Sequence, residues 1–92
     1  MSTISFKRNH TMTSDQLRQE VQALADKLID KFGGNAAWQE DEMHYEFNGG
    51  LKACVACKAE EVQVEVELEG MMSLFKGRIA SEVEDYLQRH IS

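Results

Sequence analysis

The two cysteines are the most reactive side chains in this 92-residue sequence, and they form a Cys54-x-x-Cys57 motif. A structural zinc site usually needs four ligands, and the sequence has no second cysteine pair. Thioredoxin-type chemistry needs the motif at the start of a helix, where the helix dipole lowers a thiol pKa. Here the motif lies in a strand-like alternation, so a spacing of three sends the two thiols to opposite faces of a sheet. We therefore interpret both cysteines as structural.

Other catalytic or metal-binding patterns are missing from the sequence. His10, His44 and His90 are dispersed and form no HxH or HxxxH pair. The serines lack the elbow motif of hydrolases, and no glycine-rich phosphate loop is present. Catalysis would require an unexpected meeting in space, such as His10 with Glu46, with hydrogen-bond reach to a substrate. The sequence therefore predicts a protein that is not an enzyme and that needs neither metal nor cofactor.

The segment from Gly70 to Arg78 is the best candidate for a binding surface. It places four apolar side chains before two cations, namely Met71, Met72, Leu74 and Phe75 before Lys76 and Arg78. Methionine-rich surfaces adapt to varied apolar partners. The alternative interpretation puts Leu74 and Phe75 in the core and pairs Arg78 with Glu82 at i+4. We favour the alternative, and keep the segment as the first candidate surface.

Arg8 and His10 form a second candidate surface at the end of the first predicted strand. Their spacing of two places both side chains on one face of that strand. The end of a surface strand also explains this pattern adequately.

A long helix is predicted for residues 14–32. Thr13 and Gln16 form a capping box, in which each side chain satisfies a free backbone amide. Apolar residues then recur at helical spacing, at Leu17, Val21, Leu24, Leu28 and Phe32. Gly33-Gly34 is a natural stop, because glycine adopts the left-handed conformation without penalty.

Short alternating segments predict a sheet around this helix. A first strand covers residues 3–10, and four more follow the helix, at residues 36–39, 43–47, 51–57 and 62–68. Asn48-Gly49-Gly50 indicates a hairpin. A second amphipathic helix near 74–91 is marked by Phe75, Ile79, Val83, Leu87 and Ile91. The predicted fold is α+β, in the order β-α-β-β-β-β-α, with both helices on one face of an antiparallel sheet.

Length and composition limit the class of protein. The length suits one domain, which we assign to residues 1–92. The net charge is −6, and the basic residues are scattered, which argues against nucleic-acid binding. Residues 1–8 lack the apolar run of a signal peptide, and no stretch approaches the roughly 20 apolar residues that span a bilayer. We therefore expect a cytoplasmic protein with reduced cysteines.

Together these landmarks resemble the polyhydroxyalkanoic acid system protein family, also called the polyhydroxyalkanoate granule-region family. The likeness covers nearly the whole chain, through Ile4-x-Phe6-x-Arg8-x-His10, the helix residues Leu17, Ala23, Leu24, Ala25 and Leu28, Trp38, Gly49-Gly50, Val62-x-Val64-x-Val66-x-Leu68, and Leu74-Phe75-Lys76-Gly77-Arg78-Ile79. The resemblance implies a small bacterial protein encoded near genes for storage-polyester synthesis, with no catalytic residues. The cysteine pair departs from the family pattern, which further weakens a redox or metal interpretation.

Two hypotheses of different classes follow from the resemblance. The first is a non-catalytic accessory protein that binds polyhydroxyalkanoate granules or granule-bound proteins. The second is a small carrier that holds an acyl or other apolar ligand between sheet and helices near Trp38 and Tyr45. A third alternative is a structural homo-oligomer whose sheet edges pair. The candidate binding residues are Arg8, His10, Trp38, Met71, Met72, Phe75, Lys76 and Arg78.

Overall fold

The computed structural model describes residues 2–91, and the side chains of residues 3–91. Its elements are β1 (Ser2–Asn9), α1 (Ser14–Phe32), β2 (Asn35–Gln39), β3 (Glu42–Phe47), β4 (Leu51–Cys57), β5 (Glu61–Leu68), a 3₁₀ helix η1 (Gly70–Phe75) and α2 (Lys76–His90). The predicted α+β class and element order are confirmed, with the addition of η1. The first strand ends at Asn9, so His10 lies beyond it.

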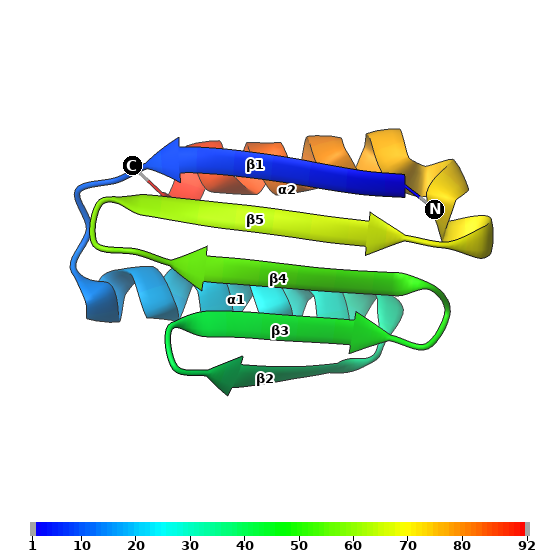
Figure 1. Cartoon of the computed structure of the whole chain (residues 1–92), viewed down its shortest axis with the longest axis horizontal. Helices are drawn as coiled ribbons and strands as arrows, with labels where there is room; N and C mark the ends of the chain where they lie inside the picture. Colours follow the sequence, from blue (N-terminus) through cyan, green and yellow to red (C-terminus); the bar gives the residue numbers. More distant parts are fainter. Residues whose placement is uncertain (1, 92) are drawn as a thin grey trace.

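The five strands form one antiparallel sheet in the order β1-β5-β4-β3-β2. Helix α1 carries the chain from β1 at one edge to β2 at the other, and a meander then returns to β1 (Figure 1). Helix α2 runs back along β1 on the same side as α1. Both helices therefore cover one face of the sheet, as predicted, and the other face is open to solvent.

Local sequence signals set both ends of α1. The Thr13 side chain accepts a hydrogen bond from the Gln16 amide, and the Gln16 side chain accepts one from the Thr13 amide. Gly33 ends the helix with φ at 87°, and its amide donates to the carbonyl of Ile29. The capping box and the glycine stop are both confirmed, because each satisfies backbone groups that the helix leaves unpaired.

Strict alternation places the core between the sheet and the helices. The inner face of the central strands is almost completely buried, through Met43, Tyr45, Leu51, Ala53, Val55, Val62, Val64, Val66 and Leu68. Helix residues pack onto this surface, through Leu17, Val21, Ala25, Ile79, Val83 and Leu87. The Tyr45 hydroxyl donates to the carbonyl of Gly33 at 2.6 Å, which joins the middle of β3 to the end of α1.

The hairpin at Asn48-Gly49-Gly50 forms as predicted, by a different geometry. The Gly50 amide donates to the Phe47 carbonyl, and among these three residues only Gly50 has a positive φ, at 106°. This is the three-residue loop in which a turn is followed by one left-handed residue. The loop sets the register of the hairpin, because Phe47 then pairs with Leu51.

The second helix begins later than predicted. Residues 70–75 form η1, and α2 starts at Lys76. A 3₁₀ helix has three residues per turn, so Met71 and Leu74 share one side, which faces solvent. Phe75 is 44% exposed and is not part of the buried stripe of α2, which begins at Ile79. The assignment of Phe75 to that stripe was therefore wrong.

Polar contacts connect the two helices. The buried Tyr86 of α2 donates a hydrogen bond to the backbone carbonyl of Glu20 at 2.9 Å. Lys31 of α1 pairs with Glu82 of α2. Burial, followed by the nearby Glu20 carboxylate, raises the pKa of Tyr86 from 10.0 to about 12.

We predict that Tyr86→Phe makes stability less sensitive to alkaline pH. The folded state keeps the phenol protonated up to about pH 12, whereas the unfolded chain ionises it near pH 10. The unfolded state therefore binds fewer protons in this window, and stability falls as pH rises. Urea unfolding between neutral pH and about pH 11 measures the slope. The variant should show a shallower decline, and an equal slope in both proteins would contradict the assignment.

We predict that Gly34→Ala destabilises the protein by about 1–3 kcal/mol. Gly34 has φ at 95°, and an added Cβ would lie 2.4 Å from the carbonyl oxygen of Glu46. Gly77→Ala is the matched control, because nothing lies within 4 Å of its added Cβ in α2. The control should gain about 0.5–1 kcal/mol. Chemical denaturation of both variants measures the difference, and equal effects would refute the steric argument.

Candidate functional site

Arg8 and His10, both predicted binding residues, contact the protein's own backbone. The Arg8 Nε donates to the carbonyl of Ile91 at 2.6 Å, which fixes the chain after α2 to the end of β1. His10 is 6% exposed; its Nε2 lies 2.8 Å from the Lys58 carbonyl, and its Nδ1 accepts from the Met12 amide at 3.1 Å. Both ring nitrogens are therefore engaged within the fold, and this geometry gives the two residues a structural role.

His10 and Glu46, the pair considered for catalysis, do not meet. Glu46 lies opposite Lys52, in a row of outward side chains that continues to Glu67 and Thr3. This row crosses the beginning of β1, whereas His10 follows its end. The two residues therefore lie toward opposite ends of the sheet.

Trp38 is held against α1 by two contacts. Its Nε1 donates to the Gln22 side chain at 2.6 Å, and the Arg18 guanidinium lies 4.3 Å from the ring centroid. Nearby Tyr45 is 1% exposed. Among the described residues, the groove between α1 and α2 offers about 20 Å³, which suffices for about one water molecule. This groove is lined by side chains such as Leu24, Leu28 and Tyr86, and neither Trp38 nor Tyr45 is part of its lining. A ligand site near Trp38 and Tyr45 therefore stays a prediction.

The residues of η1 form an exposed apolar surface at one end of the molecule. Met71, Leu74 and Phe75 are 77%, 80% and 44% exposed, and we call these three residues the apolar tip. Among the described residues these are the large hydrophobic side chains that are mainly exposed, whereas others such as Phe6 and Phe47 are partly buried. Methionine, leucine and phenylalanine are normally buried, so their clustering on one short exposed segment keeps it as a candidate contact surface.

Two expectations about this segment need correction. The favoured interpretation placed Leu74 and Phe75 in the core, and both are exposed. Met72 was a predicted binding residue, and it is 8% exposed because it anchors η1 to the core. The expected pair between Arg78 and Glu82 is present at 4.0 Å.

The predicted binding residues are not gathered in one place. The apolar tip lies beyond the end of β5, and Lys76 and Arg78 follow it in the exposed first turn of α2. Arg8 and His10 lie at the other end of the long axis, where β1 ends (Figure 1). Trp38 lies on β2, at the edge of the sheet farthest from β1. Of the predicted set, the exposed residues Met71, Phe75, Lys76 and Arg78 therefore lie close together in η1 and the first turn of α2.

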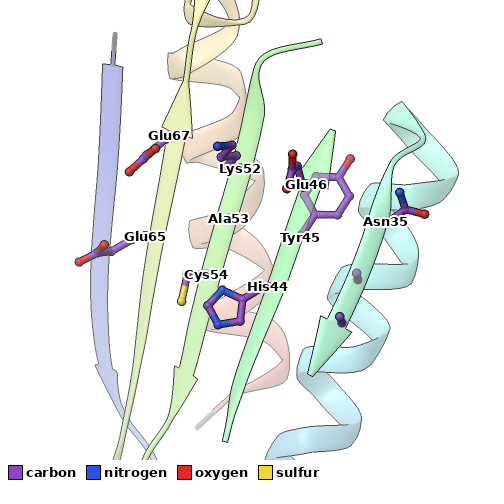
Figure 2. Close-up of a pocket in the computed structure, with 11 residues that line it drawn as sticks. Asn35, His44, Tyr45, Glu46, Lys52, Ala53, Cys54, Glu65 and Glu67 are labelled. Carbon is purple, nitrogen blue, oxygen red and sulfur yellow. The ribbon is translucent and has the colours of Figure 1, made fainter. Parts of the chain in front are cut away.

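The open face of the sheet contains a depression that the sequence analysis did not identify. Its cavity volume is about 360 Å³, and its lining includes His44, Glu46, Lys52, Cys54 and Glu65 (Figure 2). His44 lies directly opposite Cys54, and Cys54 directly opposite Glu65, across three neighbouring strands. The sequence signal indicates a hairpin at Asn48-Gly49-Gly50, but the loop length that the structure adopts decides that His44 pairs with Cys54.

The two cysteines point to opposite faces of β4, as predicted. Cys57 packs against the core, and burial raises its pKa to about 11. Cys54 faces the open side, where its Sγ donates to the Glu42 carboxylate at 3.5 Å. Burial, that bond and the charges of Glu42 and Glu65 raise the pKa of Cys54. The two sulfurs therefore lie on opposite faces of β4, and both pKa values are raised, whereas a thioredoxin-type pair brings its thiols together and lowers a thiol pKa.

We predict that His10→Ala lowers the free energy of unfolding by about 2 kcal/mol, because it removes a buried ring and the part-buried hydrogen bonds to the Met12 amide and the Lys58 carbonyl. His44→Ala is the matched control on the exposed face, and should change stability by less than about 0.5 kcal/mol. Urea denaturation compares the two variants. A larger loss at His44 than at His10 would contradict this assignment of roles.

Comparison with known proteins agrees with the resemblance seen in the sequence. No curated protein matches the chain. Residues 4–91 match the family described as "Putative polyhydroxyalkanoic acid system protein", so the match spans both helices and the strands β2 to β5 completely. The chain therefore belongs to the polyhydroxyalkanoic acid system protein family.

Proposed function

We propose that this protein is a non-catalytic accessory protein of the polyhydroxyalkanoate storage system that binds the granule surface through its apolar tip. Family membership provides the storage-polyester context. The observation that carries the proposal is the exposure of Met71, Leu74 and Phe75 on η1. A granule of apolar polyester, coated with proteins, offers the surface on which such side chains lose contact with water.

The fold holds the apolar tip in a defined conformation. Met72 is buried beneath it, the Met72 amide donates to the Glu69 carbonyl, and the Ser73 hydroxyl donates to the Gly70 carbonyl at 2.7 Å. Gly70 makes the bend after β5 with φ at 59°. Because η1 is already folded, little conformational entropy is lost when the tip is buried against a partner.

The distribution of charge also supports binding through the apolar tip. The chain has a net charge of −6, whereas Lys76 and Arg78 lie directly beside the tip. Lys76 and Arg78 would attract an anionic end group or an acidic protein on the granule, and Arg78 keeps most of its surface exposed beside its partner Glu82. The proposed compartment is the cytoplasm, where such granules form. Among the described residues, neither helix is long and apolar enough to cross a membrane.

We predict that the purified protein co-sediments with protein-free polyhydroxyalkanoate granules, and that the double variant Met71→Gln with Leu74→Gln does so about tenfold more weakly or less. Glutamine leaves the net charge unchanged and removes the apolar surface. Both positions are more than three quarters exposed, so the fold should be retained. The bound fraction is measured against protein concentration.

Ala23→Gln is the control, because Ala23 is exposed on α1, away from the tip. It should bind like the unmodified chain. An unrelated acidic domain tests for nonspecific adsorption. Failure of the unmodified chain to bind bare polymer, or equal binding by the double variant, would refute direct attachment through the tip.

A further inference from the structure

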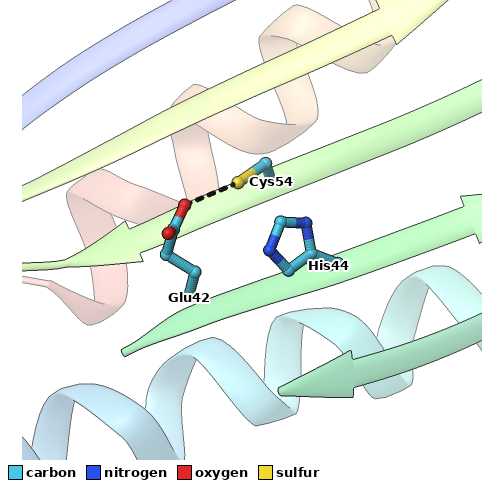
Figure 3. Close-up of side chains that lie close together, drawn as sticks. All are labelled: Glu42, His44 and Cys54. Atoms are coloured by element: carbon cyan, nitrogen blue, oxygen red, sulfur yellow. Dashed lines mark hydrogen bonds between the residues drawn. The ribbon is translucent and has the colours of Figure 1, made fainter. Parts of the chain in front are cut away.

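Three different metal-ligating side chains converge on the open face of the sheet. Glu42 and His44 project from β3, two residues apart, and Cys54 projects toward them from β4 (Figure 3). One carboxylate oxygen, one ring nitrogen and the sulfur all lie within 4.8 Å of one another. The Sγ–Oε1 distance between Cys54 and Glu42 is 3.5 Å.

The register of the sheet fixes this arrangement. His44 pairs directly with Cys54, and Glu42 lies two residues away on β3, so it projects from the same face. On β5, Glu65 lies directly opposite Cys54. Glu42, His44, Cys54 and Glu65 therefore occupy neighbouring positions on one face of three hydrogen-bonded strands. The backbone of the sheet sets the spacing of these side chains, and no loop is needed.

We propose that Glu42, His44 and Cys54 form a binding site for a divalent transition metal of the zinc type. Imidazole, thiolate and carboxylate are the ligands that Zn²⁺ takes in proteins, whereas Mg²⁺ and Ca²⁺ prefer oxygen alone. Neighbouring ligand atoms around a tetrahedral zinc ion lie about 3.5 Å apart, because the bonds are about 2.0–2.3 Å long. The Cys54 sulfur and a Glu42 oxygen already have that spacing, and the exposed Glu42 and His44 side chains are free to rotate.

The surroundings favour a cation at this point. Glu42 and Glu65 both place negative charge near the Cys54 sulfur. A bound Zn²⁺ would form the Zn–S bond as the thiol proton leaves to solvent, and it would offset the charge of the carboxylates. His44, Cys54 and Glu65 line the depression on the open face, so water there, or Glu65 opposite Cys54, would supply the fourth ligand. The site is independent of the apolar tip.

Cobalt binding tests the proposal directly. The full chain, without a histidine tag and reduced with a phosphine, is titrated with Co²⁺, and the near-ultraviolet thiolate-to-cobalt absorption band is recorded. We expect a band that saturates and that disappears when Zn²⁺ displaces the cobalt. Cys54→Ser should abolish the band, and His44→Asn should weaken cobalt binding by roughly tenfold or more.

Cys57→Ser is the matched control, since Cys57 is three residues away on the opposite face of β4. It should keep the band, with an affinity within about twofold of the unmodified chain. The proposal is overturned if the unmodified chain gives no band, if Cys54→Ser retains it, or if Cys57→Ser loses it equally. Circular dichroism checks each fold, and the exposed His44 position decides the result if Cys54→Ser unfolds.

Discussion

The inner face of β5 is the surface on which the rest of the structure rests. Val62, Val64, Val66 and Leu68 are at most 3% exposed, and their strand pairs with β1 on one side and β4 on the other. The pairing of β5 with β1 therefore joins the N-terminal strand to the meander of β2 to β5 in one sheet. Its alternate residues are polar, so a slip of one register position would bury glutamates and expose valines. That cost fixes the register of every neighbouring strand.

This constraint also separates the two surfaces that bear on function. The helices cover the inner face, and α1 reaches across to β2, so apolar side chains are removed from water over nearly the whole sheet. The chain leaves β5 after Leu68 and enters η1 at Gly70, where Met71, Leu74 and Phe75 stay exposed among the described residues. The apolar tip is exposed because the 3₁₀ turn points it away from the layer where the core lies.

The outer face is polar because successive side chains of a strand point to opposite faces, and the polar residues alternate with the buried apolar ones. Side chains there are paired across strands, and each row is defined by the register. A histidine, a cysteine and two glutamates consequently share a small area that is rich in negative charge. A granule contact at the tip and a metal on the open face use different elements. One can be removed by substitution while the other is kept, which makes the two proposals separable.

The sequence by itself determined the elements and their faces. The capping box at Thr13, the stop at Gly33 and the alternation of β3 to β5 are local signals, and each lies within a few residues of the structure that it specifies. The opposite orientation of Cys54 and Cys57 followed from strand geometry alone. These predictions are confirmed because helix caps and the alternation of side chains in a strand depend on residues that are close together in the sequence.

Tertiary structure alone decided which side chains remain exposed and which meet. The pattern of Phe75 fitted the stripe of α2, but a 3₁₀ turn removed it from the core, and Met72 became the anchor instead. His10 is buried because residues 58–60, the turn between β4 and β5, fold against it. Glu42, His44 and Cys54 converge only when β3 and β4 pair. Burial and convergence depend on contacts between distant segments, which no local pattern encodes.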